Sequence, residues 1–123
     1  MNARAGPLEG LEVRSKLWLE RGGKVALSDW RVELLLAIDE TGSLTAAAER
    51  MAVPYRTAWY KLREAEEELG VPLVSSESGG ARGGGSRLTP EGRRIAERFR
   101  RASREVDELA QRRLADEFGS EVK

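Results

Sequence analysis

The sequence predicts a mainly α-helical fold with an N-terminal β-hairpin, a second hairpin with a glycine-rich tip, and a long C-terminal helix. Apolar residues recur at helical spacing through most of residues 30–69, and again after residue 90. Glycine-rich stretches interrupt short extended runs on either side of the first helical region. With 123 residues, the chain is long enough for one compact domain and an appended helix.

The N-terminal part is expected to hold a tail and a hairpin. Residues 1–10 contain no apolar stretch typical of a signal peptide, so we expect a flexible tail and a cytoplasmic protein. Residues 13–30 form two extended runs around the glycine pair 22–23, which suits a tight hairpin turn. Counting outward from that turn predicts two cross-strand pairs, Glu20 with Val25 and Trp18 with Leu27.

Three helices are expected in the next forty or so residues, because each has its own start and stop signal. Ser28 or Asp29 can cap the first helix, which stops at the pair Thr41-Gly42. Ser43 can cap a short second helix over 44–51, and a third helix is expected over 54–69, with proline at its start. Two helices joined by a turn of about three residues are typical of a helix-turn-helix.

The third helix is expected to have one buried and one exposed face. Its small and apolar residues fall on a single stripe, namely Ala58, Leu62, Ala65 and Leu69. That phase turns Arg56, Tyr60 and Arg63 to the opposite side. Thr57 and Trp59 flank this side, and we interpret Tyr55 and Trp59 as packing residues.

The C-terminal part is expected to hold the second hairpin and the long helix. The segment VPLVSSESGGARGGGSRLTPEG predicts two short strands around a glycine-rich tip that contains Arg82. Thr89, Pro90 and Glu91 are typical of a helix start, and this helix should run to about Phe118. An apolar seam with coiled-coil spacing predicts a homodimer interface, with a cover for the core as the alternative, and it is formed by Ile95, Phe99, Ala102, Val106 and Leu109.

This order of elements is that of a winged helix-turn-helix with additions at both ends. Between about Lys16 and Arg100 it resembles the N-terminal DNA-binding domain of the ModE-type molybdenum-responsive transcriptional regulators. The resemblance rests on KLWLERGGKVALSDWR, AIDETGSLTAAAERM, PYRTAW and SGGARGGGSRLTPEG. The segments ETGSLTAAAERM and ELGVPLV are also similar to the helix-turn-helix of LysR-type regulators. Two residues depart from the family pattern: Ala52 stands where glycine is usual, and Pro54 replaces a small polar cap.

The resemblance implies a sequence-specific DNA-binding transcriptional regulator. Full-length ModE-type members carry C-terminal molybdate-binding modules, so we expect molybdate sensing to be lost or to lie on a separate partner polypeptide. The expected division is a flexible tail over 1–10, the DNA-binding domain over 11–90, a dimerisation helix over 91–118 and a frayed tail over 119–123. A homodimer would bind inverted half-sites in double-stranded DNA.

The charge pattern independently favours DNA. Lysine and arginine balance aspartate and glutamate at 21 each, but residues 43–63 carry a net charge of plus three and residues 64–70 one of minus four. A local basic face is sufficient for contact with DNA, and an arginine in the first turn of the third helix can bind guanine. The candidate DNA-binding residues are Ser43, Thr45, Arg56, Thr57, Tyr60, Lys61, Arg63, Arg82 and Arg87.

Other function classes have less support. The chain contains no cysteine and no histidine, so we expect no enzyme activity, no metal site and no cofactor. The glycine-rich tip lacks the Gly-Lys-Ser/Thr ending of a phosphate-binding loop. No apolar stretch is long enough to span a membrane, so we expect no membrane partner. The alternative function is a winged-helix protein-interaction module that pairs with another regulator.

Overall fold

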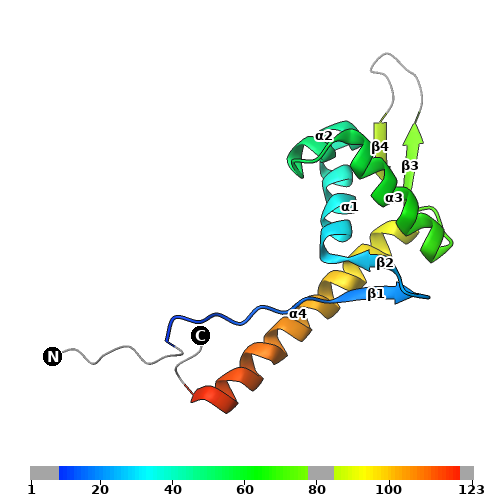
Figure 1. Cartoon of the computed structure of the whole chain (residues 1–123). Coiled ribbons are helices and arrows are strands. Elements are labelled where there is room, and N and C mark those ends of the chain that lie inside the picture. The colour runs from blue at the N-terminus through cyan, green and yellow to red at the C-terminus, as the bar shows by residue number, and fades with distance from the viewer. Residues whose placement is uncertain (1–8, 78–84, 120–123) are drawn as a thin grey trace. The chain divides into compact units, whose positions relative to one another are not determined.

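The computed structural model describes residues 9–77 and 85–119. Within them the order of elements is β1 (Trp18–Arg21), β2 (Lys24–Ser28), α1 (Asp29–Thr41), α2 (Leu44–Arg50), α3 (Tyr55–Leu69), β3 (Val74–Glu77), β4 (Gly85–Leu88) and α4 (Pro90–Phe118). Strands β1 and β2 form one antiparallel hairpin, and β3 and β4 form another. Figure 1 shows α1, α2 and α3 grouped together, with β3 and β4 beside α3. The predicted winged helix-turn-helix is therefore confirmed.

The chain divides into two compact units. The first comprises Trp18–Arg100 and contains both hairpins, α1, α2, α3 and the start of α4. The second combines the segment up to Leu17 with the segment from Arg101 onward. Within the second unit, the Ser15 hydroxyl donates a hydrogen bond to Asp107 Oδ1 at 3.0 Å. None of the helices in the described ranges is long and apolar enough to cross a membrane.

The N-terminal hairpin has the predicted turn but not the whole predicted register. Glu20 pairs with Val25 as expected, whereas Trp18 lies opposite Ser28 rather than Leu27. The register shifts between Leu19 and Glu20, so that Leu19 is the residue opposite Leu27. The expected Trp18–Leu27 pair is thus wrong, because a β-bulge inserts one extra residue into β2. Such a bulge lies outside what alternation along a strand can predict.

The first helix begins and ends at the predicted signals. Ser28 caps α1 by accepting a hydrogen bond from the Arg31 backbone N–H at 3.2 Å. At the other end Gly42 adopts the left-handed conformation, with φ of 83°, and its N–H donates to the Ile38 carbonyl. Six large side chains then form the centre of the core, namely Leu27, Val32, Leu34, Leu35, Ile38 and Leu73.

The turn between α2 and α3 is strained at the position singled out in the sequence. Ala52 has a φ of 59°, in the left-handed region that favours glycine. The Ala52 N–H donates to Glu49 O and the Val53 N–H donates to Ala48 O, both at 3.0 Å. These two hydrogen bonds form a Schellman motif, which ends α2 and sets the angle at which α3 leaves. Alanine here costs about 1 kcal/mol relative to a residue without a side chain.

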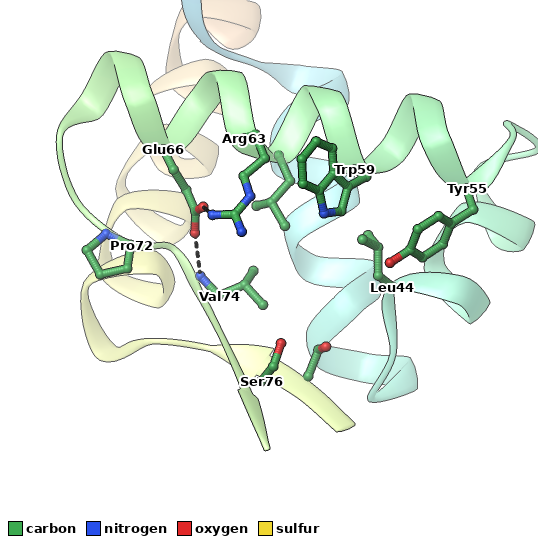
Figure 2. A pocket seen from close by; sticks show the side chains of 10 residues that line it. Leu44, Tyr55, Trp59, Arg63, Glu66, Pro72, Val74 and Ser76 are labelled. Atoms are coloured by element: carbon green, nitrogen blue, oxygen red, sulfur yellow. Dashed lines mark hydrogen bonds and ion pairs between the residues drawn. The ribbon is translucent and has the colours of Figure 1, made fainter. Parts of the chain in front are cut away.

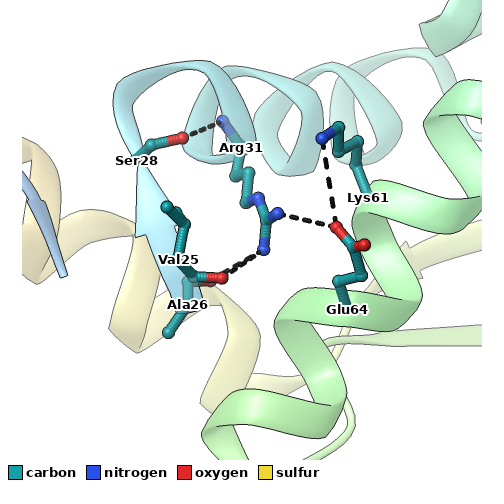
Figure 3. Close-up of polar contacts among 6 residues, drawn as sticks. All are labelled: Val25, Ala26, Ser28, Arg31, Lys61 and Glu64. Carbon is teal, nitrogen blue, oxygen red and sulfur yellow. Dashed lines mark hydrogen bonds and ion pairs between the residues drawn. The ribbon is translucent and has the colours of Figure 1, made fainter. Parts of the chain in front are cut away.

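A buried arginine of α1 connects this helix with β2 and with α3 (Figure 3). Arg31 is 7% exposed, and its guanidinium donates to the Val25 carbonyl and to Glu64 Oε1, both at 2.8 Å. Lys61 Nζ lies 4.0 Å from the same carboxylate oxygen. The contacts link β2, α1 and α3, so Glu64 has a structural partner in the protein.

The base of the second hairpin is fixed to the start of α4. Thr89 caps α4 by accepting from the Gly92 N–H at 2.9 Å, and its hydroxyl donates to the Pro72 carbonyl at 2.8 Å. The Thr89 N–H donates to the Leu73 carbonyl at 2.9 Å. The helix start predicted at Thr89 is confirmed, and it holds β4 against the segment that follows α3.

A second polar contact connects α1 with α4. Asp39 accepts hydrogen bonds from Arg93 Nη1 at 2.7 Å, from Arg93 Nη2 at 3.2 Å, and from the Leu88 N–H at 3.1 Å. These donors, the Arg93 guanidinium first and the Leu88 N–H next, hold the pKa of the Asp39 carboxyl below its ordinary value. The ionised form of Asp39 is therefore favoured by the folded state.

Asp39 should make the protein sensitive to acid. Because the pKa is lower in the folded state, its contribution to stability is fully present above the ordinary value of 3.8 and is lost as pH falls through the folded value. Urea unfolding between pH 7 and pH 3 should show a steeper loss of stability for the wild type than for Asp39→Asn. Parallel curves for the two proteins would contradict this assignment.

Candidate nucleic-acid interface

The face of α3 opposite the core carries the predicted contact residues. Ala58, Leu62 and Ala65 are buried, so the helix turns Arg56 and Tyr60 into solvent, while Thr57 and Lys61 are half-buried at its edges. Among the described residues, no acidic side chain forms an ion pair with Arg56. Its guanidinium is therefore free to bind an external acceptor, and it lies in the first turn of the helix.

Arg63 is engaged within the protein. Its Nη1 lies 3.3 Å from Glu66 Oε1, and its guanidinium carbon lies 5.2 Å from the centre of the Trp59 ring. Both contacts lie within the protein, and the Arg63 side chain remains 60% exposed. Figure 2 shows Trp59, Arg63 and Glu66 in a row along the side of α3 that faces a pocket.

Two of the glutamates in the acidic second half of α3 bind partners within the protein. Glu66 Oε2 accepts hydrogen bonds from the Leu73 N–H at 2.8 Å and the Val74 N–H at 3.2 Å, and Glu64 pairs with Arg31. These carboxylates fix β2 and the base of β3 to α3. The sequence shows that glutamates cluster in this half of the helix, but it does not show which partner each carboxylate binds.

Two aromatic residues interpreted as packing residues are exposed instead. Tyr55 is 52% exposed and Trp59 is 38% exposed, and Tyr60 beside them is 53% exposed. The packing interpretation is wrong, because the stripe of alanines and Leu62 occupies the narrow contact of α3 with the core. For Trp59 a signal was available, because it follows Ala58 by one residue and so lies about 100° around the helix from that stripe. Tyr55 lies three residues before Ala58, on the side of the stripe, so helical spacing gave no such signal for it.

The remaining predicted contact residues differ in availability. Ser43 caps α2 by accepting from the Ala46 N–H at 2.9 Å, a bond that does not use its O–H donor, and Thr45 is exposed. Arg87 is exposed on β4. Arg82 lies outside the described residues. In the described ranges no group of three acidic residues is arranged to hold a metal ion.

The predicted seam of α4 is split between the two units. Phe99 is 5% exposed and belongs to the core of the first unit, and Ile95 is half-buried. Ala102, Val106 and Leu109 are exposed in the second unit, with Val106 at 40% and Leu109 at 48%. A partner helix could therefore reach the last three residues of the seam but not Phe99, which packs within its own protomer.

Comparisons with known proteins agree with this geometry. A family model described as bacterial regulatory helix-turn-helix protein, lysR family, matches residues 31–93. The chain is 37% identical over 86 residues to the molybdenum transport protein ModE of Azotobacter vinelandii, covering 70% of this chain and 32% of that protein. It is 40% identical over 77 residues to the molybdenum-pterin-binding protein MopB of Rhodobacter capsulatus, covering 63% of this chain and 28% of that one. The chain thus spans about a third of the length of these relatives.

Solved structures show the same arrangement of elements. The crystal structure of the CbnR_DBD–DNA complex superposes with a TM-score of 0.55 and 27% identity, covering 70% of this chain and 93% of that chain. The crystal structure of the BenM_DBD/benA site 1 DNA complex superposes with a TM-score of 0.50 and 25% identity, covering 64% and 86%. Both of these similar proteins were crystallised with DNA.

Proposed function

Since this chain belongs to the lysR family of bacterial regulatory helix-turn-helix proteins, we propose that it is a transcriptional regulator that binds double-stranded DNA sequence-specifically. The observation that carries the proposal is the exposed Arg56 in the first turn of α3, which forms no ion pair within residues 9–77 and 85–119, with Tyr60 one turn later on the same face. In a helix-turn-helix, the first turns of the second helix meet base edges in the major groove. Arginine is the residue that most often binds guanine there.

The proposal assigns separate tasks to the parts of the chain. Residues 11–90 bind DNA: α3 enters the major groove, while Thr45, Lys61 and Arg87 contact phosphates, together with Arg82 at the wing tip. Residues 91–118 form a homodimer, so that two copies of α3 bind inverted half-sites. The protein would work in the cytoplasm and without catalysis. A response to molybdenum through a separate sensing polypeptide is part of this proposal, supported by the names of the relatives.

Replacing Arg56 tests the contact with bases. Arg56→Ala should weaken binding to an operator, obtained by selection of bound oligonucleotides, by about 1 to 3 kcal/mol and relax the preference at one base pair. Gel-shift titrations against operators that vary at each position would measure both effects. Lys24→Ala is a matched control, because Lys24 is an exposed cation on the N-terminal hairpin. An equal loss on every sequence for Arg56→Ala would contradict a role in base recognition.

Replacing Val106 tests the dimer. Val106→Glu places a charge on the exposed apolar stripe, so we expect monomers in sedimentation at concentrations where the wild type is dimeric, because an unpaired buried carboxylate is strongly unfavourable. Ala115→Glu adds the same charge at an exposed position of α4 off the stripe and should leave the mass unchanged. An unchanged mass for Val106→Glu would exclude this interface.

A further inference from the structure

Three exposed aromatic side chains line the same hollow on α3 as Arg56. Tyr55, Trp59 and Tyr60 follow one another within two turns, and Trp59 meets Tyr60 edge to face with ring centres 5.3 Å apart. Large aromatic residues are usually covered in folded proteins, and a cluster left in solvent commonly marks a contact surface. This cluster borders two hollows on the first unit, with volumes of about 330 and about 210 Å³.

Trp59 is held in place by a chain of contacts that begins at the wing. The Leu73 and Val74 backbone N–H groups fix Glu66 Oε2, the other oxygen of Glu66 lies 3.3 Å from Arg63, and the guanidinium of Arg63 covers the Trp59 ring at 5.2 Å (Figure 2). Each link in this chain is a directional contact. The indole is therefore an oriented apolar surface beside the first turns of α3.

From this arrangement we propose that Trp59 recognises the C5-methyl group of a thymine, and that Arg63 is a positioning residue for Trp59 rather than a phosphate ligand. This inference rests on the proposed function. The thymine methyl is the apolar group on the base edges of the major groove, and it matches an apolar ring better than any neighbouring donor or acceptor does. Arg56, three residues before Trp59 on α3, supplies the hydrogen bond to a base that an indole face cannot make.

The experiment replaces thymine by deoxyuridine, which removes the methyl group and leaves base pairing intact. On the selected operator, wild-type protein should lose about fourfold in affinity at one thymine, the change expected for one methyl-sized apolar contact. The same replacement of thymine should not change the affinity of the Trp59→Ala variant for the operator. A wild type indifferent to deoxyuridine at every position would overturn the inference while leaving DNA binding itself established. A loss that persists in Trp59→Ala would assign the methyl contact to another residue and overturn it as well.

Arg63→Gln tests the positioning role. The variant should show a smaller deoxyuridine effect at the same thymine, whereas the slope of log affinity against log salt concentration should match the wild type. A phosphate ligand would instead lower that slope by about one unit per site. A reduced slope with an unchanged deoxyuridine effect would overturn the role given to Arg63. Absence of any DNA binding by the wild type would refute the proposed function, a result distinct from these.

Discussion

Raising the salt concentration from 50 to 200 mM should lower the affinity of this protein for its operator by roughly a thousandfold or more, the loss expected for six to ten phosphate contacts. The proposed function gives each protomer three cations for phosphate contacts, namely Lys61, Arg87 and Arg82, and a dimer doubles this number. Gel-shift or anisotropy titrations at four salt concentrations would give the slope.

Removing one of the proposed phosphate-binding cations provides the control for this prediction. Arg87→Ala should reduce the slope by about one unit for each protomer on DNA and weaken all sequences alike, because phosphate contacts carry no sequence information. Binding that is undetectable, or that does not change with salt, would contradict the assignment to DNA. That outcome would favour the alternative function, a winged-helix module that pairs with another regulator.

Gly92→Ala should destabilise the protein by about 3 kcal/mol, the upper part of the range for overpacked positions. A Cβ atom at residue 92 would lie 3.0 Å from the Cα and the carbonyl carbon of Leu73, and closer still to its carbonyl oxygen. Leu73 is fully buried, and its carbonyl accepts the Thr89 N–H, so this backbone cannot move without breaking the base of the wing. Alanine is otherwise the better helix former, so the sign of the effect distinguishes steric conflict from helix propensity.

Urea unfolding with Arg98→Ala as the control would measure this effect. Arg98 is exposed on the same helix, and its replacement should change the free energy of unfolding by less than about 0.5 kcal/mol. A Gly92→Ala protein as stable as the wild type would show that α4 does not approach Leu73 this closely in solution.

The sequence alone determined the elements that depend on neighbouring residues. The caps at Ser28, Ser43 and Thr89 satisfy backbone N–H groups three residues away, so these helix starts could be predicted almost to the residue. The left-handed backbone at Ala52 was indicated by the family resemblance, because glycine is usual at that position. The face of α3 that carries Arg56 followed from helical periodicity.

Only the tertiary structure decided which partners these side chains meet. Arg63 pairs with Glu66 because the base of β3 holds that carboxylate, and Trp59 stands exposed next to Arg63. Phe99 packs into its own protomer. Gly92 is required by the carbonyl of a residue nineteen positions earlier in the chain. Local signals fix backbone conformation because their atoms are neighbours along the chain. Burial and charge pairing depend on atoms that only folding brings together. Periodicity in the sequence therefore does not predict these contacts.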